Sequence, residues 1–319
     1  MRSMRIALVL AAAALTTACE LKEVSLTEPE RVVVAEAYVR VNLGPGLGIQ
    51  PGPNISVFLH ETLSITGGSK AVPGAQIVIT RPSDGLRIPL EASVLGDCVI
   101  VTPAGQTGTC YAPRAGTPGL QSLAPSDRLD LRIDLAGGGV MTSETVVPGT
   151  FALLNVADAA TCVLDPLTAS DIVWSRSAGA WAYISDTFIH GLAASFDADQ
   201  VEDPLYLFGL SVSSQDTAIV FPREFGLFAR ADLDFEVSAM LQKGLPTDAT
   251  ATVSVAAVDR NWVNWARGGI FNPSGVVRVP SVRGDGTGVF ASTVVRSFRV
   301  AATSNPTAKK CPPAPAVAP

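Results

Sequence analysis

Charged side chains are scarce in this 319-residue chain, since Asp, Glu, Lys and Arg together make up 16% of it and the formal net charge is −6. An acidic chain lacks the positive field that attracts nucleic acid or an anionic membrane surface, which excludes both as charge-driven partners. The apolar content of 47% is too high for a disordered polymer. We therefore expect a chain that folds around a hydrophobic core.

Histidine is also rare, with His60 and His190 as the only two. A hydrolase triad needs a histidine beside an activated serine and an acid, and the sequence has no Gly-x-Ser-x-Gly elbow. His60 is followed by Glu61, but no second histidine stands at the spacing of a zinc protease. We expect packing or surface roles for both histidines, no catalytic residues and no cofactor.

Long apolar runs are confined to the start of the chain. A basic stretch (1–5) precedes an uncharged run (6–15), and small residues (16–18) lead to Cys19. This order is typical of a secretory leader, and the run is about half the length of roughly twenty residues that a membrane span needs. The position of Cys19 resembles the bacterial lipobox, although Leu15 lies one place further from the cysteine than usual. The resemblance implies that Cys19 is acylated and becomes the mature N-terminus.

Cys19 therefore predicts a protein anchored in the lipid bilayer of the cell envelope, with residues 1–18 as leader and 19–30 as tether. The alternative is an ordinary secreted protein with a chance cysteine near the cleavage site. The lipobox resemblance implies three acyl chains, which suffice for stable anchoring where one does not. Glu20 follows the cysteine in place of the Asp that favours inner-membrane retention, so we expect the outer membrane.

Four cysteines remain after Cys19: Cys98, Cys110, Cys162 and Cys311. The envelope is oxidising, so we expect disulfides, for which three connectivities exist. We favour Cys98 with Cys110, which flank a turn-rich stretch, and Cys162 with Cys311, which bracket the second half of the chain. A zinc site is disfavoured because no two of these cysteines have the close spacing of zinc ligands.

Short segments rich in β-branched residues predict an all-β fold. The 28 glycines and 23 prolines supply the turns that such short strands need. We expect two β-sandwich domains of immunoglobulin-like or fibronectin-like type, at 31–150 and 160–303, and a flexible Pro/Ala-rich tail at 304–319. The expected strands are 31–42, 54–63, 76–80, 86–90, 98–101, 108–111, 128–135 and 140–147, then 171–176, 180–187, 205–212, 217–221, 235–241, 249–258, 276–282 and 289–301. A short helix is expected near 260–267, with Asp259 as its N-cap.

Several short segments resemble, in order, a bacterial lipoprotein family known as domain of unknown function 4249. Besides Cys19, these segments are 32–38, 72–75 with the Asp84-Gly85 turn, 141–145, 258–262 and 284–290. The resemblance implies a front sandwich like those of transthyretin and carboxypeptidase regulatory domains, followed by a fibronectin-like domain. It also implies an accessory role beside an outer-membrane TonB-dependent receptor, and it carries no catalytic residues.

Acidic side chains gather in one stretch of the second half. Asp197, Asp199, Glu202 and Asp203 lie within seven residues, and calcium takes its oxygen ligands from such loops. The stretch lacks the glycine and the terminal glutamate of an EF-hand loop. A solvated acidic loop is the favoured interpretation, so no metal is predicted.

Two further motifs have a structural and a functional interpretation. Trp262 and Trp265 lie three apart and share a helix face, which caps the core or stacks on a sugar. Gly284, Gly286 and Gly288 precede an expected strand, whereas a phosphate loop leads into a helix, so a tight turn is favoured. We expect a non-catalytic binding or scaffolding module with a protein or glycan partner. The alternatives are a carbohydrate-binding module and an envelope hydrolase.

Overall fold

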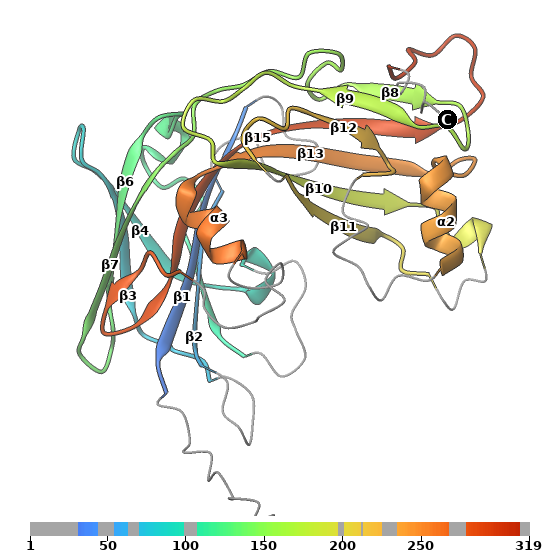
Figure 1. The fold of residues 1–319 in the computed structure, drawn as a ribbon. Helices are drawn as coiled ribbons and strands as arrows, with labels where there is room; N and C mark the ends of the chain where they lie inside the picture. The colour runs from blue at the N-terminus through green and yellow to red at the C-terminus, as the bar shows by residue number, and fades with distance from the viewer. Residues whose placement is uncertain are drawn as a thin grey trace, which may run out of the picture.

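The computed structural model describes residues 31–43, 54–62, 70–98, 107–196, 201–211, 213–224, 235–267 and 279–312. Strands dominate it, which confirms the predicted all-β class (Figure 1). The strands are β1 (Val33–Asn42), β2 (Asn54–Glu61), β3 (Gln76–Arg81), β4 (Leu86–Ser93), β5 (Thr109–Ala112), β6 (Arg128–Asp134), β7 (Val140–Val146), β8 (Thr161–Leu164), β9 (Ser170–Val173), β10 (Ala182–His190), β11 (Leu205–Leu210), β12 (Ala218–Phe221), β13 (Thr250–Val258), β14 (Arg283–Gly284) and β15 (Thr287–Ala302). The helices are α2 (Phe235–Lys243) and α3 (Arg260–Arg267), with short 3-10 turns η1 (Leu95–Asp97), η2 (Leu120–Ser122) and η3 (Ala193–Ser195).

Hydrogen bonds join most strands into one 13-stranded mixed sheet of order β11-β10-β13-β15-β1-β2-β5-β4-β3-β6-β7-β14, with β8 paired to β15. Strands β12 and β9 form a separate two-stranded sheet. Strands β1 to β7 lie on one side of the molecule, which we call the front, and β8 to β13 lie with α2 on the other, which we call the back (Figure 1).

The long strand β15 belongs to both sides. Its first part, from Thr287 to Val295, runs parallel to β1, and the part from Thr293 to Ala301 runs antiparallel to β13. Strand β14 also returns to the front, where it pairs with β7. The expected pair of separate sandwiches, divided between 150 and 160, is therefore not confirmed, because a C-terminal strand completes the front side.

Alternation of apolar and polar residues sets which sheet face is buried. In β6, Leu129, Leu131 and Ile133 are buried, whereas Arg128 and Arg132 on the other face of the strand are exposed. Each such side chain stabilises the fold by about 2 kcal/mol through removal of its apolar surface from water. One contiguous core cluster extends from these residues into the second half of the chain.

Helix α3 covers part of the sheet face that points away from this large core cluster. The predicted position of the helix and its predicted cap are both confirmed. The Asp259 carboxylate accepts the Trp262 backbone N–H at 2.9 Å, which satisfies a donor that the first helical turn leaves unpaired. Val263 is buried against a second, smaller cluster that includes Ala256 and Val295.

The expected strand at 235–241 is wrong, because this segment forms helix α2. Phe235, Val237 and Ala239 lie two apart, as on one face of a strand, but Val237 and Leu241 also lie four apart, as on one face of a helix. Val237 and Leu241 are buried, whereas Phe235 is 83% exposed, which is the pattern of one helix face. Glu236 in the first turn and Lys243 in the last also suit the helix dipole.

The expected strand at 276–282 is also wrong over its described part, residues 279–282, and β14 begins only at Arg283. The backbone N–H groups of Ser281 and Val282 both donate to the carbonyl oxygen of Gly288, at 2.9 and 3.1 Å. These bonds form a turn across the start of β15 in place of a sheet ladder. Of the expected strand 98–101, Cys98 lies in a turn and the rest lies outside the described residues.

The Gly284–Gly288 stretch is a close-packed turn, as favoured over a phosphate loop. A Cβ atom on Gly284 would lie 2.1 Å from the carbonyl oxygen of Val140, and one on Gly288 would lie 2.0 Å from that of Ala35. Strand β15 follows the turn where a phosphate loop would lead into a helix. These glycines let β14 and β15 approach the front strands.

Candidate functional site

Both predicted disulfides are confirmed. Cys98 and Cys110 are bonded with an S–S distance of 2.04 Å, and Cys162 and Cys311 with one of 2.08 Å. The second bond ties residues up to Pro312 to β8, where the Cys311 N–H donates to the Val163 carbonyl at 2.8 Å. This part of the tail that was expected to be flexible is therefore held in place, and residues 313–319 lie outside the described part.

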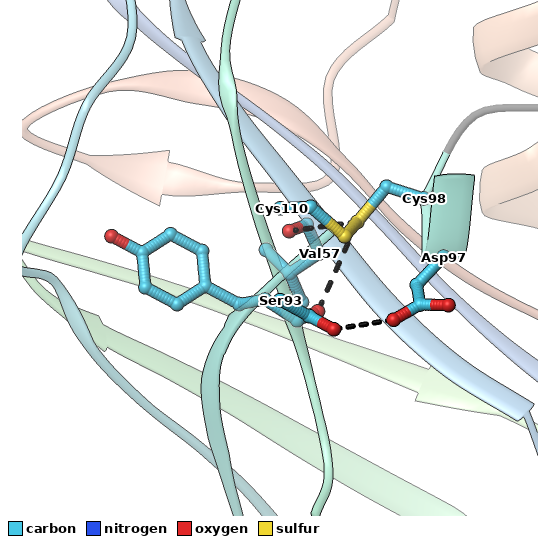
Figure 2. The surroundings of a disulfide bond; sticks show 6 residues. Val57, Ser93, Asp97, Cys98 and Cys110 are labelled. Carbon is cyan, nitrogen blue, oxygen red and sulfur yellow. Dashed lines mark hydrogen bonds between the residues drawn. A yellow bond between two sulfur atoms is a disulfide. The ribbon is translucent and has the colours of Figure 1, made fainter. Parts of the chain in front are cut away.

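The Cys98–Cys110 bond fixes β5 beside the end of β4 (Figure 2). The Ser93 hydroxyl donates to the Asp97 carboxylate next to it. The Cys98 sulfur lies 3.5 Å from the Val57 carbonyl oxygen, a contact without a hydrogen bond because a bonded sulfur has no proton. The bond thereby anchors the segment that follows β5 along the chain.

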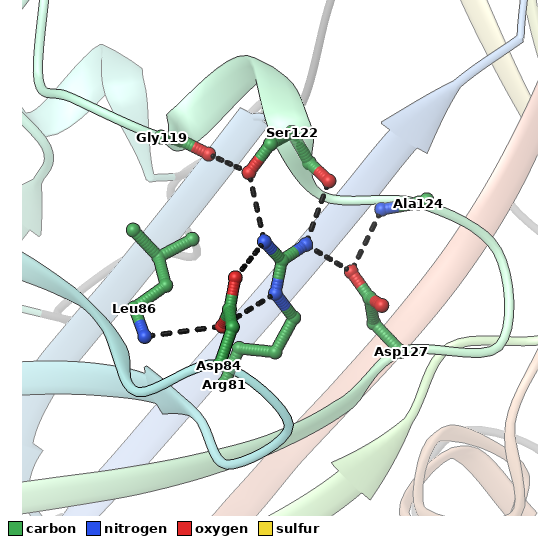
Figure 3. A network of polar contacts seen from close by, with 7 residues as sticks. All are labelled: Arg81, Asp84, Leu86, Gly119, Ser122, Ala124 and Asp127. Carbon is green, nitrogen blue, oxygen red and sulfur yellow. Dashed lines mark hydrogen bonds and ion pairs between the residues drawn. The ribbon is translucent and has the colours of Figure 1, made fainter.

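A network around Arg81 holds the other end of that segment (Figure 3). The guanidinium donates to both carboxylate oxygens of Asp84, to the carbonyl and hydroxyl of Ser122, and to Asp127, at distances between 2.6 and 3.1 Å. These bonds use all five of its N–H groups. The hydrogen bond from Arg81 lowers the pKa of Asp84 to about 2. The predicted Asp84-Gly85 turn is thus tied to the chain around residue 122.

Between these two braces lies a hollow of about 330 Å³, which we call the β4 hollow. One wall is β4, with Leu86, Arg87, Pro89 and Glu91, and the other is the segment 114–118. Pro89 restricts the backbone of the β4 wall. Pro118 and the turn from Arg114 to Thr117 restrict the other wall, so both walls are stiff.

The segment 114–118 lies directly on β4. Gly119, at its end, has φ of +74°, and a Cβ atom there would lie 2.3 Å from a methyl carbon of Leu86. The Thr117 hydroxyl and N–H both donate to the Arg114 carbonyl, at 2.7 and 3.0 Å. Local bonds and the two braces thus define the shape of the β4 hollow.

The rim of the β4 hollow carries charge. Arg114 and Glu91 form an ion pair at 2.5 Å, with side chains 75% and 53% exposed, so solvent limits its worth to about 1 kcal/mol or less. Arg87 is exposed, and within the described part of the chain its guanidinium forms no hydrogen bond or ion pair. The rim thus carries two positive charges, on Arg87 and Arg114, and one negative charge, on Glu91.

The β4 hollow could not be predicted from the sequence, because its two walls are separate in the chain. The local signal was present in the run from Pro113 to Gly119, Pro-Arg-Ala-Gly-Thr-Pro-Gly, which places an arginine in a stiff turn soon after Cys110. Nothing in the sequence indicates that this turn lies on β4.

The acidic candidates for calcium are only partly described. Asp197 and Asp199 lie outside the described residues. The Asp203 carboxylate accepts the Gly191 N–H at 2.9 Å, and Glu202 is exposed. Among the described residues, no three His, Cys, Asp or Glu side chains converge as metal ligands.

The two tryptophans of α3 differ from an exposed stacking pair. Trp262 is partly buried, packs against the smaller core cluster and has its ring 5.7 Å from that of Phe208. Trp265 is half-buried on the same helix. The core-capping interpretation therefore fits Trp262.

The two histidines lie on strands that three others separate in the sheet order. His60 is buried, its Nδ1 lies 2.8 Å from the Glu61 carbonyl oxygen and its Nε2 lies 3.8 Å from Glu36. His190 is exposed, 4.0 Å from Asp203. The contacts of His60 are those of a packed strand residue.

A polar group that no local sequence pattern indicates lies on the sheet face that α3 partly covers. Arg40 on β1 and Asp186 on β10 approach to 3.5 Å, although β15 and β13 lie between their strands. The Tyr206 hydroxyl donates to Asp186 at 2.7 Å, and burial raises the pKa of Tyr206. A pair this shielded is costly to break, because one partner alone would be a buried charge.

The Asp259 carboxyl joins the two sides of the molecule. Its Oδ2 accepts the Thr145 hydroxyl at 2.5 Å, and Thr145 Oγ1 lies 2.7 Å from the Ser292 hydroxyl. Burial raises the pKa of Asp259 from 3.8 to about 6, although the Thr145 hydrogen bond opposes that rise. The carboxyl has a capping role and lies outside the β4 hollow.

No helix among the described residues is both long and apolar enough to cross a bilayer. No protein-family model matches the chain, and no curated protein is significantly similar to it.

Proposed function

We propose that this chain is an envelope lipoprotein, tethered through acylated Cys19, that acts as a non-catalytic binding module with the β4 hollow as its ligand site. The observation that carries the binding role is the construction of the hollow, whose walls are fixed at one end by the Cys98–Cys110 bond and at the other by Arg81. Stiff walls lower the entropy cost of binding, which is how a rigid scaffold presents a site.

The two disulfides support export. They join all four cysteines that follow Cys19, and disulfides persist in oxidising compartments. The leader at 1–18 and Glu20 after the cysteine support the outer membrane as location. The lipoprotein family resemblance supports an accessory role beside an outer-membrane receptor.

The rim of the β4 hollow supports binding without catalysis. It holds arginines, a glutamate and a threonine, whereas both histidines lie elsewhere and His60 is engaged in packing. Acid–base work at neutral pH usually falls to histidine or to a carboxyl with a strongly perturbed pKa. The carboxyl whose pKa rises to about 6, Asp259, is bonded into a helix cap instead.

Cell fractionation tests the tether. The full chain and its Cys19→Ser variant are expressed in a Gram-negative host, and membranes are washed with high salt. We expect the wild-type chain to stay with the membranes and to be acylated, and the variant to lose the acyl chains, with both disulfides formed in each. A soluble wild-type chain, or an acylated variant, would contradict the proposal.

A further inference from the structure

We infer that the β4 hollow binds a small organic carboxylate with an apolar body. The inference rests on the proposed function and deepens it, because it names the ligand class of the same site. Three features of the β4 hollow carry it: the apolar walls, the excess of positive charge at the rim, and the guanidinium of Arg87.

The walls select an apolar body. Leu86 and Pro89 line the wall on β4, and Ala115 and Pro118 line the other wall. The volume of about 330 Å³ lies at the small end of ligand sites. A sugar would leave its hydroxyl groups against these side chains without partners, which disfavours a glycan here.

The rim selects a negative charge. Arg114 is partly neutralised by Glu91 at 2.5 Å, whereas Arg87 has no such partner among the described residues. The local charge is therefore positive on a chain whose net charge is −6. An anionic ligand gains attraction at this rim, although the net charge of the whole chain is negative.

Arg87 selects a planar pair of oxygens. A guanidinium presents two parallel N–H groups, which match the two oxygens of a carboxylate. Because Arg87 forms no ion pair with a described residue, a ligand can bind it without first breaking one. Inorganic phosphate offers the oxygens but has no apolar body for the walls.

A titration with matched probes tests the inference. The full chain in detergent is titrated with 2-naphthoate and with the neutral 2-naphthylmethanol, and binding is followed by ligand-observed NMR. We expect naphthoate to bind about tenfold more tightly than the alcohol, as expected for one charge-assisted contact at an exposed site. Equal affinities would overturn the inference, as would tighter binding of inorganic phosphate than of naphthoate.

Variants locate the site. We expect Arg87→Gln to weaken naphthoate binding about tenfold and Glu91→Gln to strengthen it, because the second change removes the rim's one negative charge. Arg283→Gln is the matched control, since Arg283 is exposed, lies on β14 and forms no side-chain ion pair with a described residue. All three positions are exposed, and an unchanged melting temperature checks folding.

Naphthoate affinity that is unchanged in Arg87→Gln, or lowered equally in Arg283→Gln, would overturn the inference. Membrane retention separates this failure from failure of the proposed function. A chain that stays on membranes through Cys19 but binds no naphthoate loses the inferred ligand class and keeps the tether. A soluble wild-type chain contradicts the tether whatever it binds.

Discussion

Burial and hydrogen bonding act against each other at Asp259. Asp259 is 5% exposed, and burial raises the pKa of its carboxyl although Thr145 and the Trp262 N–H both bond to it. The charged form is therefore less stable in the folded chain than in water, even with its partners in place. The N-cap that begins α3 has an energetic cost at neutral pH.

This cost predicts a pH dependence of stability. The folded pKa of about 6 lies above the ordinary 3.8, so the folded chain binds the proton more tightly than the unfolded chain. The contribution is fully present below about pH 4 and is lost as the pH rises through about 6, a change of about 3 kcal/mol. Urea unfolding of the wild type and of Asp259→Asn at about pH 4 and about pH 8 measures it.

The difference in unfolding free energy between these two proteins should shift in favour of Asp259→Asn at the higher pH. The substitution keeps a side-chain oxygen for the cap and removes the titration. A difference that is constant with pH, or that shifts in favour of the wild type, would contradict the assigned pKa.

At the same scale, some residue roles could be predicted from sequence and others could not. The cap at Asp259 and the pairing of Cys98 with Cys110 depend on residues close in the chain, and both were predicted. The approach of Arg40 to Asp186 depends on the curvature of a sheet with two strands between them. No local pattern encodes that curvature.

At the scale of elements, the two disulfides should differ in what they contribute. Cys98 and Cys110 are 12 residues apart, whereas Cys162 and Cys311 are 149 apart. In the chain-entropy model the bonds stabilise the fold by about 3 and about 5 kcal/mol, because a longer closed loop restricts the unfolded chain more. Paired Cys→Ala variants of each bond, compared by urea unfolding, measure the two values.

Each pair variant removes two sulfurs from buried or half-buried positions, so the packing loss is similar in both. The long-range pair should be the more damaging one to remove. A larger loss from the Cys98–Cys110 pair would show that local bracing outweighs loop entropy in this chain.

Helix α2 shows why a local pattern misleads. Residues 235–239 alternate between apolar and polar, so the sequence indicates a strand. A nine-residue helix that buries Val237 and Leu241 on one face uses the same residues. Packing against the sheet decides between the two, and the sequence of the segment does not contain that information.

At the scale of the whole molecule, β15 joins regions that are far apart in the chain. Residues 287–295 pair with β1 at the front, and 293–301 pair with β13 at the back. The sequence predicted both strands but not their pairing, because nothing near residue 290 specifies a partner near residue 38. The same limit explains why the β4 hollow was missed and why two separate sandwiches were expected.

The central claim for the whole molecule is that a disulfide-bonded β fold is tethered to lipid at its mature N-terminus. Intact-mass spectrometry of the protein purified from its native membrane tests this in one measurement. We predict a chain that begins at Cys19, carries a diacylglyceryl group and an N-acyl chain, and lacks the four hydrogens lost in forming two disulfides. A mass that includes residues 1–18, or one with an unmodified Cys19, would contradict it.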